Sequence, residues 1–177
     1  CDGFFYKGKT VAVIGGGDTA TEEASYLAKL CQKVYLIHRR DELRASKAMQ
    51  ERVFNTPNIE MVWNSIPVEI LGQEDKFSKS VTGIKIKNTS TNIETTIAVD
   101  GVFIAIGHHP NTDIFRGQLE LDAEGYIVTQ AGTSLTNIPG VFAAGDVQDK
   151  HYKQAITAAA GGCKAAIDAE HFLLNNE

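Results

Sequence analysis

Apolar runs alternate with an amphipathic stretch at the start of the chain, and this order predicts a strand, a helix and a second strand. The run 10–14 is continuously apolar after its threonine, which is typical of a strand buried on both faces of a parallel sheet. From Asp18 to Leu30, apolar and small residues recur at helical spacing. The next apolar run, 34–37, predicts the second strand. Together the three segments indicate a β-α-β unit of an α/β fold.

The pattern then changes to short strands. A second helix is expected to begin with Ser46 as its cap and to end before Pro57. Four strands are expected next, at about 59–63, 66–71, 81–87 and 93–99. Their alternating polarity and short connections predict an antiparallel meander. The apolar run 101–107 is expected to return to the parallel sheet as a central strand.

A break after Gly107 predicts a domain boundary, with one domain over 1–107 and part of another over 108–177. His108 and His109 interrupt the apolar run there, and Pro110 keeps the residue before it extended. The two histidines are a hinge candidate, and a metal site is disfavoured because no third ligand is spaced near them.

The second segment is short for a core of its own. Short strands are expected near 119–121 and 126–129, and a long helix from about Gln154 to Leu173. One face of that helix carries only small side chains, at Ala155, Ala159, Gly162, Cys163 and Ala166. Side chains that small predict the close approach of another backbone or of a flat ligand.

Composition and charge narrow the class of protein. The chain has 177 residues, 43% of them hydrophobic and 22% charged, as in soluble globular proteins. A net charge of −5, with one local basic cluster, argues against nucleic acid or an anionic membrane as a partner. No apolar run has the length of a membrane span, and no signal peptide is expected.

Cysteine usage favours a reducing compartment, hence a cytoplasmic protein. The three cysteines, Cys1, Cys31 and Cys163, are widely spaced and odd in number, unlike a secreted disulfide framework. We expect Cys31 and Cys163 to be small core residues on helical faces. Because the chain begins at Cys1 rather than at Met, we expect a fragment or a processed product.

The candidate chemistry begins with a glycine-rich turn between the first strand and the first helix. Its sequence, Gly-Gly-Gly-Asp-Thr-Ala over 15–20, has the strand-turn-helix context that a dinucleotide-binding G-x-G-x-x-A motif requires. Free N–H groups at the helix N-terminus would bind the phosphates. The residues expected to bind the dinucleotide here are Gly15, Gly17, Asp18, Thr19 and Ala20. An ordinary strand-to-helix connection is the alternative.

A basic cluster predicts which dinucleotide binds. About 20 residues after such a turn, an NAD site places an acidic residue on the ribose 2′-hydroxyl. That place is taken here by basic residues, namely His38, Arg39, Arg40 and Arg44. Guanidinium groups suit a 2′-phosphate, so the cofactor is predicted to be NADP(H). The alternative for these arginines is a solvated basic surface.

Further segments resemble a known family. The stretch Thr136 to Val147 resembles the second flavin-binding signature of two-domain flavoprotein disulfide reductases. The start of the chain, Cys-Asp-Gly-Phe-Phe-Tyr over 1–6, resembles the continuation of the C-x-x-C-D-G motif of low-molecular-weight, bacterial-type thioredoxin reductases. The segments 38–41, 105–108 and 154–157 fit the same family.

The resemblance implies a fold and a set of roles. The fold is a Rossmann-like three-layer NADP(H)-binding domain with an antiparallel β-meander, followed by the C-terminal part of a second, FAD-binding Rossmann-like domain. Cys1 would be the flavin-proximal cysteine of the redox pair. Asp2 would be the acid that protonates the leaving thiolate or a flavin-derived intermediate. The FAD-binding residues would be Gly145, Asp146, Val147, Lys153, Gln154, Ala155 and Ile156. Lys153 stands where the family more often has arginine.

The activity implied is that of an NADPH-dependent, FAD-containing thioredoxin-disulfide reductase, a cytoplasmic homodimer with thioredoxin as its partner. Two rivals of the same fold are the flavoprotein subunit of alkyl hydroperoxide reductase and a ferredoxin–NADP reductase. The first FAD half-domain and the first cysteine of the redox pair are not in this sequence. As it stands, the chain could be a non-catalytic NADP-binding module, and we expect it to hold FAD poorly.

Overall fold

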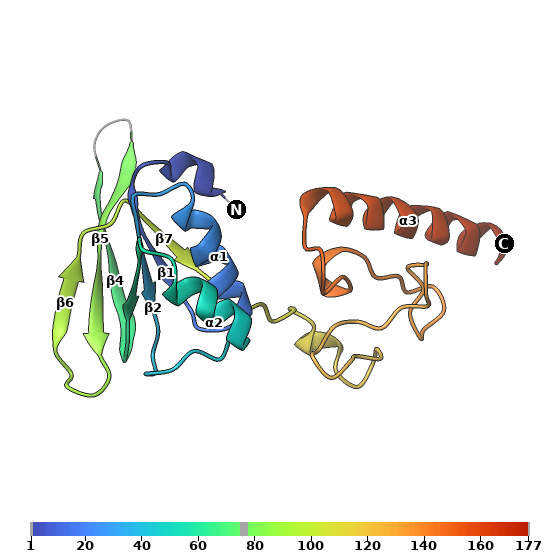
Figure 1. Cartoon of the computed structure of the whole chain (residues 1–177). Coiled ribbons are helices and arrows are strands. Elements are labelled where there is room, and N and C mark those ends of the chain that lie inside the picture. The colour runs from blue at the N-terminus through green and yellow to red at the C-terminus, as the bar shows by residue number, and fades with distance from the viewer. Residues whose placement is uncertain (1, 75–77, 177) are drawn as a thin grey trace. The chain divides into compact units, whose positions relative to one another are not determined.

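The computed structural model describes residues 2–74 and 78–176, which fall into two compact units, Cys1–Gly107 and His108–Glu177. Figure 1 labels the principal helices and strands of both units.

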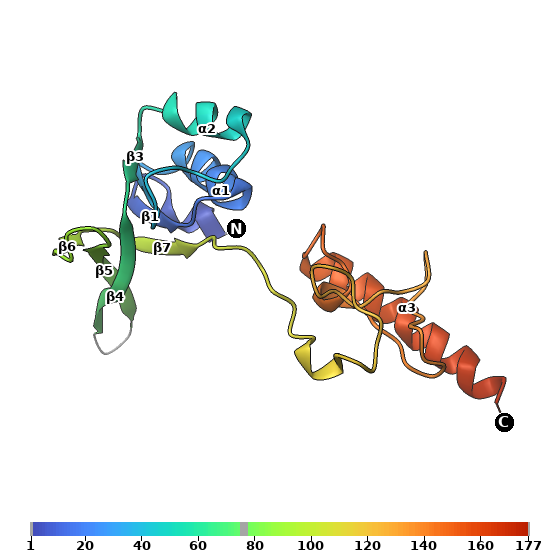
Figure 2. The same ribbon diagram turned by 90° about the horizontal axis from the view of Figure 1, so that it is seen from below.

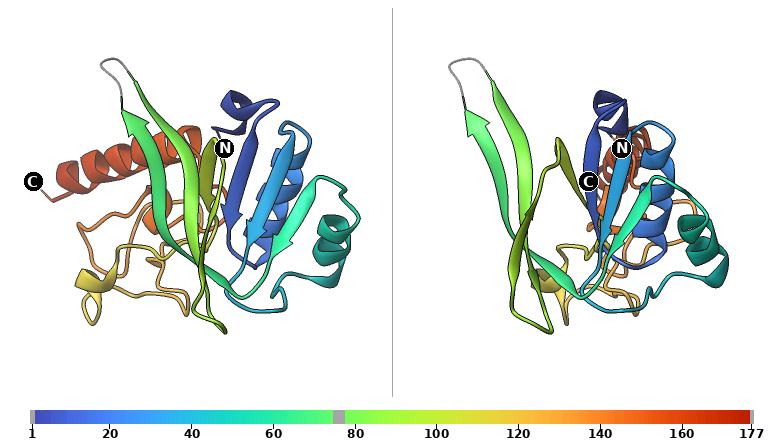
Figure 3. Two further views of the ribbon diagram at one scale, coloured as in Figure 1. Left: turned by 90° about the vertical axis from the view of Figure 1, so that its left-hand side faces the viewer. Right: turned by 60° about the vertical axis from the view of Figure 1, so that its left-hand side comes forward.

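A four-stranded parallel sheet lies at the centre of the first unit. Its strands are β1 (Thr10–Ile14), β2 (Lys33–Ile37), β3 (Ile59–Val62) and β7 (Gly101–Ile104). They run in the order β3-β2-β1-β7, and all three pairings are parallel (Figure 3). The crossovers are α1 (Asp18–Ala28), between β1 and β2, and α2 (Lys47–Phe54), between β2 and β3. The predicted β-α-β unit is therefore confirmed.

The apolar run of β1 is continuous because the strand is covered on both faces. Val11 and Val13 pack in the cluster that includes Leu27 of α1. Ala12 and Ile14 pack in a second cluster, which includes Ile84 of the antiparallel sheet. Helices, parallel sheet and antiparallel sheet thus form three layers (Figures 1 and 2).

The antiparallel sheet is a meander of three strands. They are β4 (Ser65–Glu74), β5 (Lys79–Asn88) and β6 (Glu94–Ile97), paired in the order β4-β5-β6. The predicted meander is confirmed for these segments.

Two strand predictions for the first unit are wrong. Residues 59–63 were expected in the meander, but β3 joins the parallel sheet, because α2 returns the chain beside β2. The run 101–107 was expected at the centre of the sheet. Within the described residues β7 pairs only with β1 and ends at Ile104, so it lies at the edge.

The helix starts agree with the sequence, with one difference in capping. The helix α1 begins at Asp18 after Gly17, and α2 begins at Lys47 after Ser46 and ends before Pro57. The hydroxyl of Ser46 makes no capping hydrogen bond. Its backbone N–H instead donates to Asp18 Oδ1, at 2.9 Å.

A short 3-10 helix, η1 (Asp2–Tyr6), precedes β1. The Tyr6 ring meets the Phe103 ring edge to face at 5.2 Å, which holds η1 against β7. Gly101 of β7 leaves room for this contact, since a Cβ there would overlap the Tyr6 ring.

The second unit consists of loops, two short 3-10 helices and one long helix. These are η2 (Asp113–Phe115), η3 (Gly145–Val147) and α3 (Ala155–Leu174). The prediction of strands near 119–121 and 126–129 is wrong. The two segments form no strand and are joined by the isolated bridge between Leu121 and Ile127. The Asp168 carboxylate ties α3 to the loop before it, accepting hydrogen bonds from the N–H and hydroxyl of Ser134 at 2.9 and 2.7 Å.

The face of α3 that meets its own unit is not the predicted one. Gly161, not Gly162, makes the close approach, since a Cβ on Gly161 would lie 3.3 Å from the Gly145 nitrogen and one on Gly162 would meet nothing within 4 Å. Cys163 is exposed, so its prediction as a core residue is wrong, whereas Cys31 is buried as predicted. No helix in the described parts of the chain is both long and apolar enough to cross a membrane.

Candidate functional site

The glycine-rich turn connects β1 to α1, and its first glycine has no room for a side chain. Gly15 has a φ of +155°, and a Cβ there would overlap the Ala105 carbonyl oxygen and lie 2.7 Å from the Ala20 Cβ. Ala20 is fully buried, so a larger residue at either position would separate α1 from the sheet. These two residues therefore make the tight turn possible.

The N-terminus of α1 is open. A Cβ on Gly17 would meet nothing within 4 Å, so a ligand can approach the backbone there. The first intrahelical hydrogen bonds run from the N–H groups of Ala20 and Thr21 to the Gly17 oxygen, both at 3.1 Å. The amides of Asp18 and Thr19 precede these bonds and can donate to an anion.

A cavity of about 690 Å³ opens beside this turn. It lies where β1, β2 and β7 end and β4 begins, and ligands of α/β folds bind at such carboxyl ends of strands. Of the predicted dinucleotide residues, those lining it are Gly15, Gly17, Thr19, His38, Arg39 and Arg44. Asp18, Ala20 and Arg40 are not among the lining residues.

Part of the cavity wall is apolar and could not be read from local motifs. It is formed by Ile14, Ile37, Ile66, Pro67, Ile104 and Ile106. Ile104 and Ile106 are 60% and 69% exposed, although the sequence places them in a buried run. Only the folded chain brings the start of β4 and the end of β7 to the glycine turn.

The segment between β2 and α2, residues 38–46, is called the basic loop here, and its backbone is hydrogen-bonded to the glycine turn. The Gly16 oxygen accepts hydrogen bonds from the N–H groups of Arg44 and Ala45, at 2.7 and 3.1 Å. Arg39, Arg40 and Arg44 are exposed, and within residues 2–74 and 78–176 no recorded ion pair involves them. The guanidinium groups of Arg39 and Arg44, which line the cavity, are therefore available to an anion there.

His38 is the buried member of the basic cluster. Its side chain is 5% exposed and lies under Gly16, where any Cβ would overlap the imidazole ring. Burial lowers the pKa of His38, and the positive charges of Arg44, Arg39 and Arg40 lower it further. The imidazole is thus neutral near pH 7, and its Nε2 has no hydrogen-bond partner in the described structure.

Of the two predicted catalytic residues, Cys1 lies outside the described residues. Asp2 is exposed at the start of η1. Two exposed rings follow it, those of Phe4 and Phe5, 72% and 73% exposed.

The predicted flavin residues gather around the start of α3 in the second unit. Gly145 has a φ of +75° and begins η3, with Asp146 exposed and Val147 half-buried. The Gln154 N–H donates to Thr157 Oγ1 at 3.2 Å, which caps α3. Ala155 and Ile156 form the exposed first turn.

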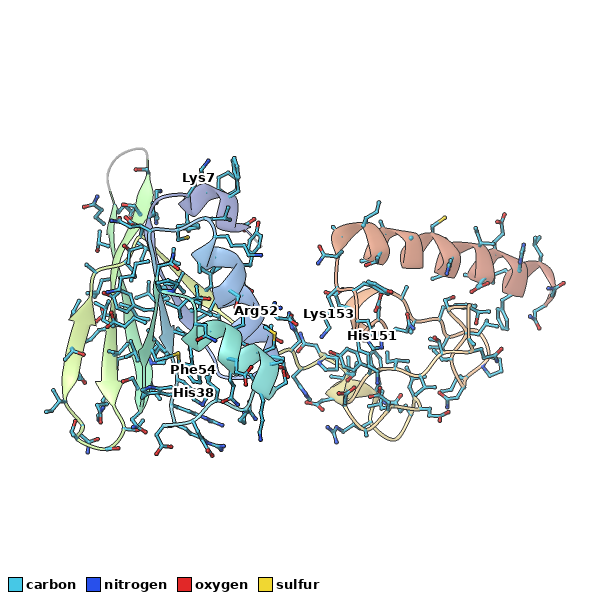
Figure 4. All side chains as sticks on the ribbon, in the orientation of Figure 1. Lys7, His38, Arg52, Phe54, His151 and Lys153 are labelled. Atoms are coloured by element: carbon cyan, nitrogen blue, oxygen red, sulfur yellow. The ribbon has the colours of Figure 1, made fainter. Side chains whose placement is uncertain are left out.

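Lys153 has a φ of +39°, a left-handed backbone that is strained for lysine. Its ammonium lies 5.1 Å from the Tyr126 ring centre, in cation–π range. Figure 4 labels this side chain at the start of the segment that leads into α3.

Thioredoxin reductases of known sequence match almost the whole chain. Thioredoxin reductase 2 of Arabidopsis thaliana is 54% identical over 175 residues, which are 98% of this chain and 45% of that protein. A thioredoxin reductase of Streptomyces coelicolor is 53% identical over 173 residues, or 98% of this chain and 52% of that protein. The chain therefore spans about half the length of the curated relatives it matches.

Solved structures confirm the fold class. Thioredoxin reductase from Streptococcus pyogenes matches with a TM-score of 0.86 at 39% identity, over 99% of this chain and 56% of that one. The enzyme from Giardia duodenalis matches with a TM-score of 0.81 at 45% identity, over 98% of this chain and 56% of that one.

Residues 1–162 match the family described as pyridine nucleotide-disulphide oxidoreductase. That range includes the glycine turn, the basic loop and the Gly145–Asp146 pair. The chain belongs to the pyridine nucleotide-disulphide oxidoreductases.

Proposed function

We propose that this chain provides the NADP(H)-binding domain, 1–107, and the C-terminal part of the FAD-binding domain, 108–177, of an NADPH-dependent thioredoxin-disulfide reductase. The observation that carries the proposal is the basic loop, hydrogen-bonded to a dinucleotide-type glycine turn at the edge of a cavity. Thioredoxin as the acceptor is supported by relatives that are named thioredoxin reductase. They are more than half identical to this chain over almost its whole length.

The first unit fits NADPH. The open amides after Gly17 would bind the pyrophosphate, and Arg39, Arg40 and Arg44 would bind the 2′-phosphate. Neutral His38, packed against Gly16, would hold the start of the basic loop against the glycine turn.

The second unit fits part of a flavin site. Asp146 would accept a hydrogen bond from a ribityl hydroxyl, and Gly145, with its positive φ, would allow that close approach. The N-terminus of α3, at Gln154 to Ile156, would favour negative charge on the ring system.

When bound, NADPH supplies a hydride and FAD passes its electron pair to an enzyme disulfide. Cys1 would be one of the two sulfurs of that disulfide, and Asp2 would supply the proton for the thiolate. The resulting dithiol would reduce thioredoxin by exchange, through a mixed disulfide. From the same resemblance we propose that the whole protein is a cytoplasmic homodimer, which sedimentation and cell fractionation can test.

Titration calorimetry of the 177-residue chain with NADPH and with NADH tests the assignment. We expect NADPH to bind at least tenfold more tightly, because each charge-assisted contact to the 2′-phosphate contributes about 1.5–3 kcal/mol. Arg44→Ala should weaken NADPH binding about tenfold and change NADH binding little.

Arg52→Ala is the matched control, since Arg52 is an exposed arginine of α2 that does not line the cavity. It should leave both affinities unchanged. Equal dissociation constants for NADPH and NADH in the unaltered chain would contradict the proposal.

A further inference from the structure

We propose that Asp18 is a positioning residue for nucleotide selectivity: it holds the loop of Arg44 against the glycine turn and so sets the preference for a 2′-phosphate. The inference rests on the proposed NADP(H) site. It assigns the Asp18 carboxylate no contact with the nucleotide, in agreement with the absence of Asp18 from the cavity lining.

The contacts between the loop and the turn carry the argument. Two of them are backbone hydrogen bonds, from Arg44 and Ala45 to the Gly16 oxygen. The third runs from the Ser46 N–H to Asp18 Oδ1, at 2.9 Å. Unlike the first two, it uses a side chain, and the Ser46 side chain also hydrogen-bonds with the Asp18 carboxylate.

The location of Asp18 makes this contact strong. Asp18 is the first residue of α1, and Ser46 is the N-cap of α2, so the carboxylate lies at the N-termini of two helices. Both helix dipoles favour a negative charge there. The hydrogen bonds from Ser46 lower the pKa of Asp18, which keeps the carboxylate ionised as an acceptor at neutral pH.

The same part of the loop is also held from α2. The Gln50 side chain donates to the Leu43 and Ala45 oxygens at 3.3 and 2.8 Å, from within α2. Gln50 therefore shapes the loop but does not connect it to the turn. The Asp18 bond adds to the two backbone bonds at Gly16 a contact between the loop of Arg44 and the first residue of α1, whose amide is one of the phosphate-binding amides.

Two variants break the same bond from opposite sides. Asp18→Ala removes the acceptor. Ser46→Pro removes the N–H and the hydroxyl with which Ser46 hydrogen-bonds with Asp18, and the φ of −57° at Ser46 already suits proline. Asp18→Asn keeps an acceptor oxygen and loses the charge. Asp41→Asn, at an exposed acid of the same loop, removes one charge without a recorded contact.

The measurement is the ratio of dissociation constants for NADPH and NADH, by calorimetry on the 177-residue chain. Thermal unfolding followed by fluorescence of Trp63, the only tryptophan, checks that each variant is folded. We expect Asp18→Ala and Ser46→Pro each to lower the preference for NADPH about tenfold, with NADH affinity changed less than about twofold. Combining them should add little, because they remove one shared interaction. Asp18→Asn should keep the preference within about twofold.

Two outcomes would overturn the inference while the proposed function stands. In the first, the unaltered chain prefers NADPH, and Asp18→Ala and Ser46→Pro keep that preference. In the second, Asp18→Asn, Asp18→Ala and Asp41→Asn all change the NADPH affinity by the same factor, and all change the NADH affinity by the same factor. The effect would then come from the lost negative charge and not from the hydrogen bond. An unaltered chain with no preference for NADPH overturns the proposed function, and the inference with it.

Discussion

At the scale of single residues, the sequence predicts the basic cluster but not the difference in burial among its members. Arg39 and Arg44 line the cavity and are exposed, whereas His38, their neighbour, is buried beneath Gly16. That difference depends on where Gly16 lies after folding. The offset from the turn predicts a cluster of positive charge, but only the packing shows that one member is a neutral support.

The buried His38 should make the stability of the chain depend on pH. The pKa of His38 is lowered in the folded chain, so below about pH 6.5 the unfolded chain binds a proton that the folded chain excludes. The free energy of unfolding should therefore be highest above that pH and fall as the pH drops towards the folded pKa. Urea unfolding followed by Trp63 fluorescence at about pH 7.5 and pH 5.5 measures this.

His38→Gln cannot titrate and should show a smaller loss between the two pH values, whatever its stability at neutral pH. His151→Gln, at an exposed histidine of the second unit, is the control and should keep the loss of the unaltered chain. An equal pH dependence in His38→Gln and the unaltered chain would count against a buried neutral imidazole.

At the scale of elements, hydrophobic periodicity predicts the buried strands and the helices, but not how a strand pairs or which face of a helix packs. The strands β1 and β2 are continuously apolar because layers cover both faces, so both are predicted. The strand β3 has the alternation of an antiparallel strand, and only the crossover through α2 places it in the parallel sheet. In α3 almost every residue near the middle is small, so periodicity predicts a helix but not which face packs.

The two adjacent glycines of α3 allow a direct test of its packed face. Gly162→Ala should raise the free energy of unfolding by about 0.5–1 kcal/mol, because alanine is the better helix former and the new Cβ meets nothing within 4 Å. Gly161→Ala gains the same propensity, but its Cβ would lie 3.3 Å from the Gly145 nitrogen. It should therefore be less stable than Gly162→Ala, and Gly161→Val less stable than the unaltered chain.

Urea unfolding followed by far-ultraviolet circular dichroism, which is sensitive to α3, measures the series. Equal stabilities of the two alanine variants would show that Gly161 does not need to be small. The close approach of α3 to η3 would then be wrong.

At the scale of the whole molecule, the two units differ in how much of a nucleotide site each contains. The glycine turn, the basic loop and the cavity wall all come from residues before His108, so the proposed NADP(H) site lies within the first unit. The second unit contributes Gly145, Asp146 and the start of α3. The family signature predicts these residues from the sequence, and their proposed role in flavin binding is still to be tested.

We therefore expect the 177-residue chain to bind NADPH and to retain little FAD. Most of the anion site for a dinucleotide comes from a glycine turn at a helix N-terminus, and the one such turn in this sequence, at 15–20, belongs to the first unit. The α3 helix has no buried residue, and Ile156 at its start is 78% exposed, so the expected flavin surface lacks a second wall. Gel filtration after incubation with excess FAD, followed by flavin absorbance, measures retention, and calorimetry with NADPH on the same sample shows that the first site is intact. The whole protein is the positive control. One FAD retained for each 177-residue chain would show that the second unit forms a complete flavin site without a further wall.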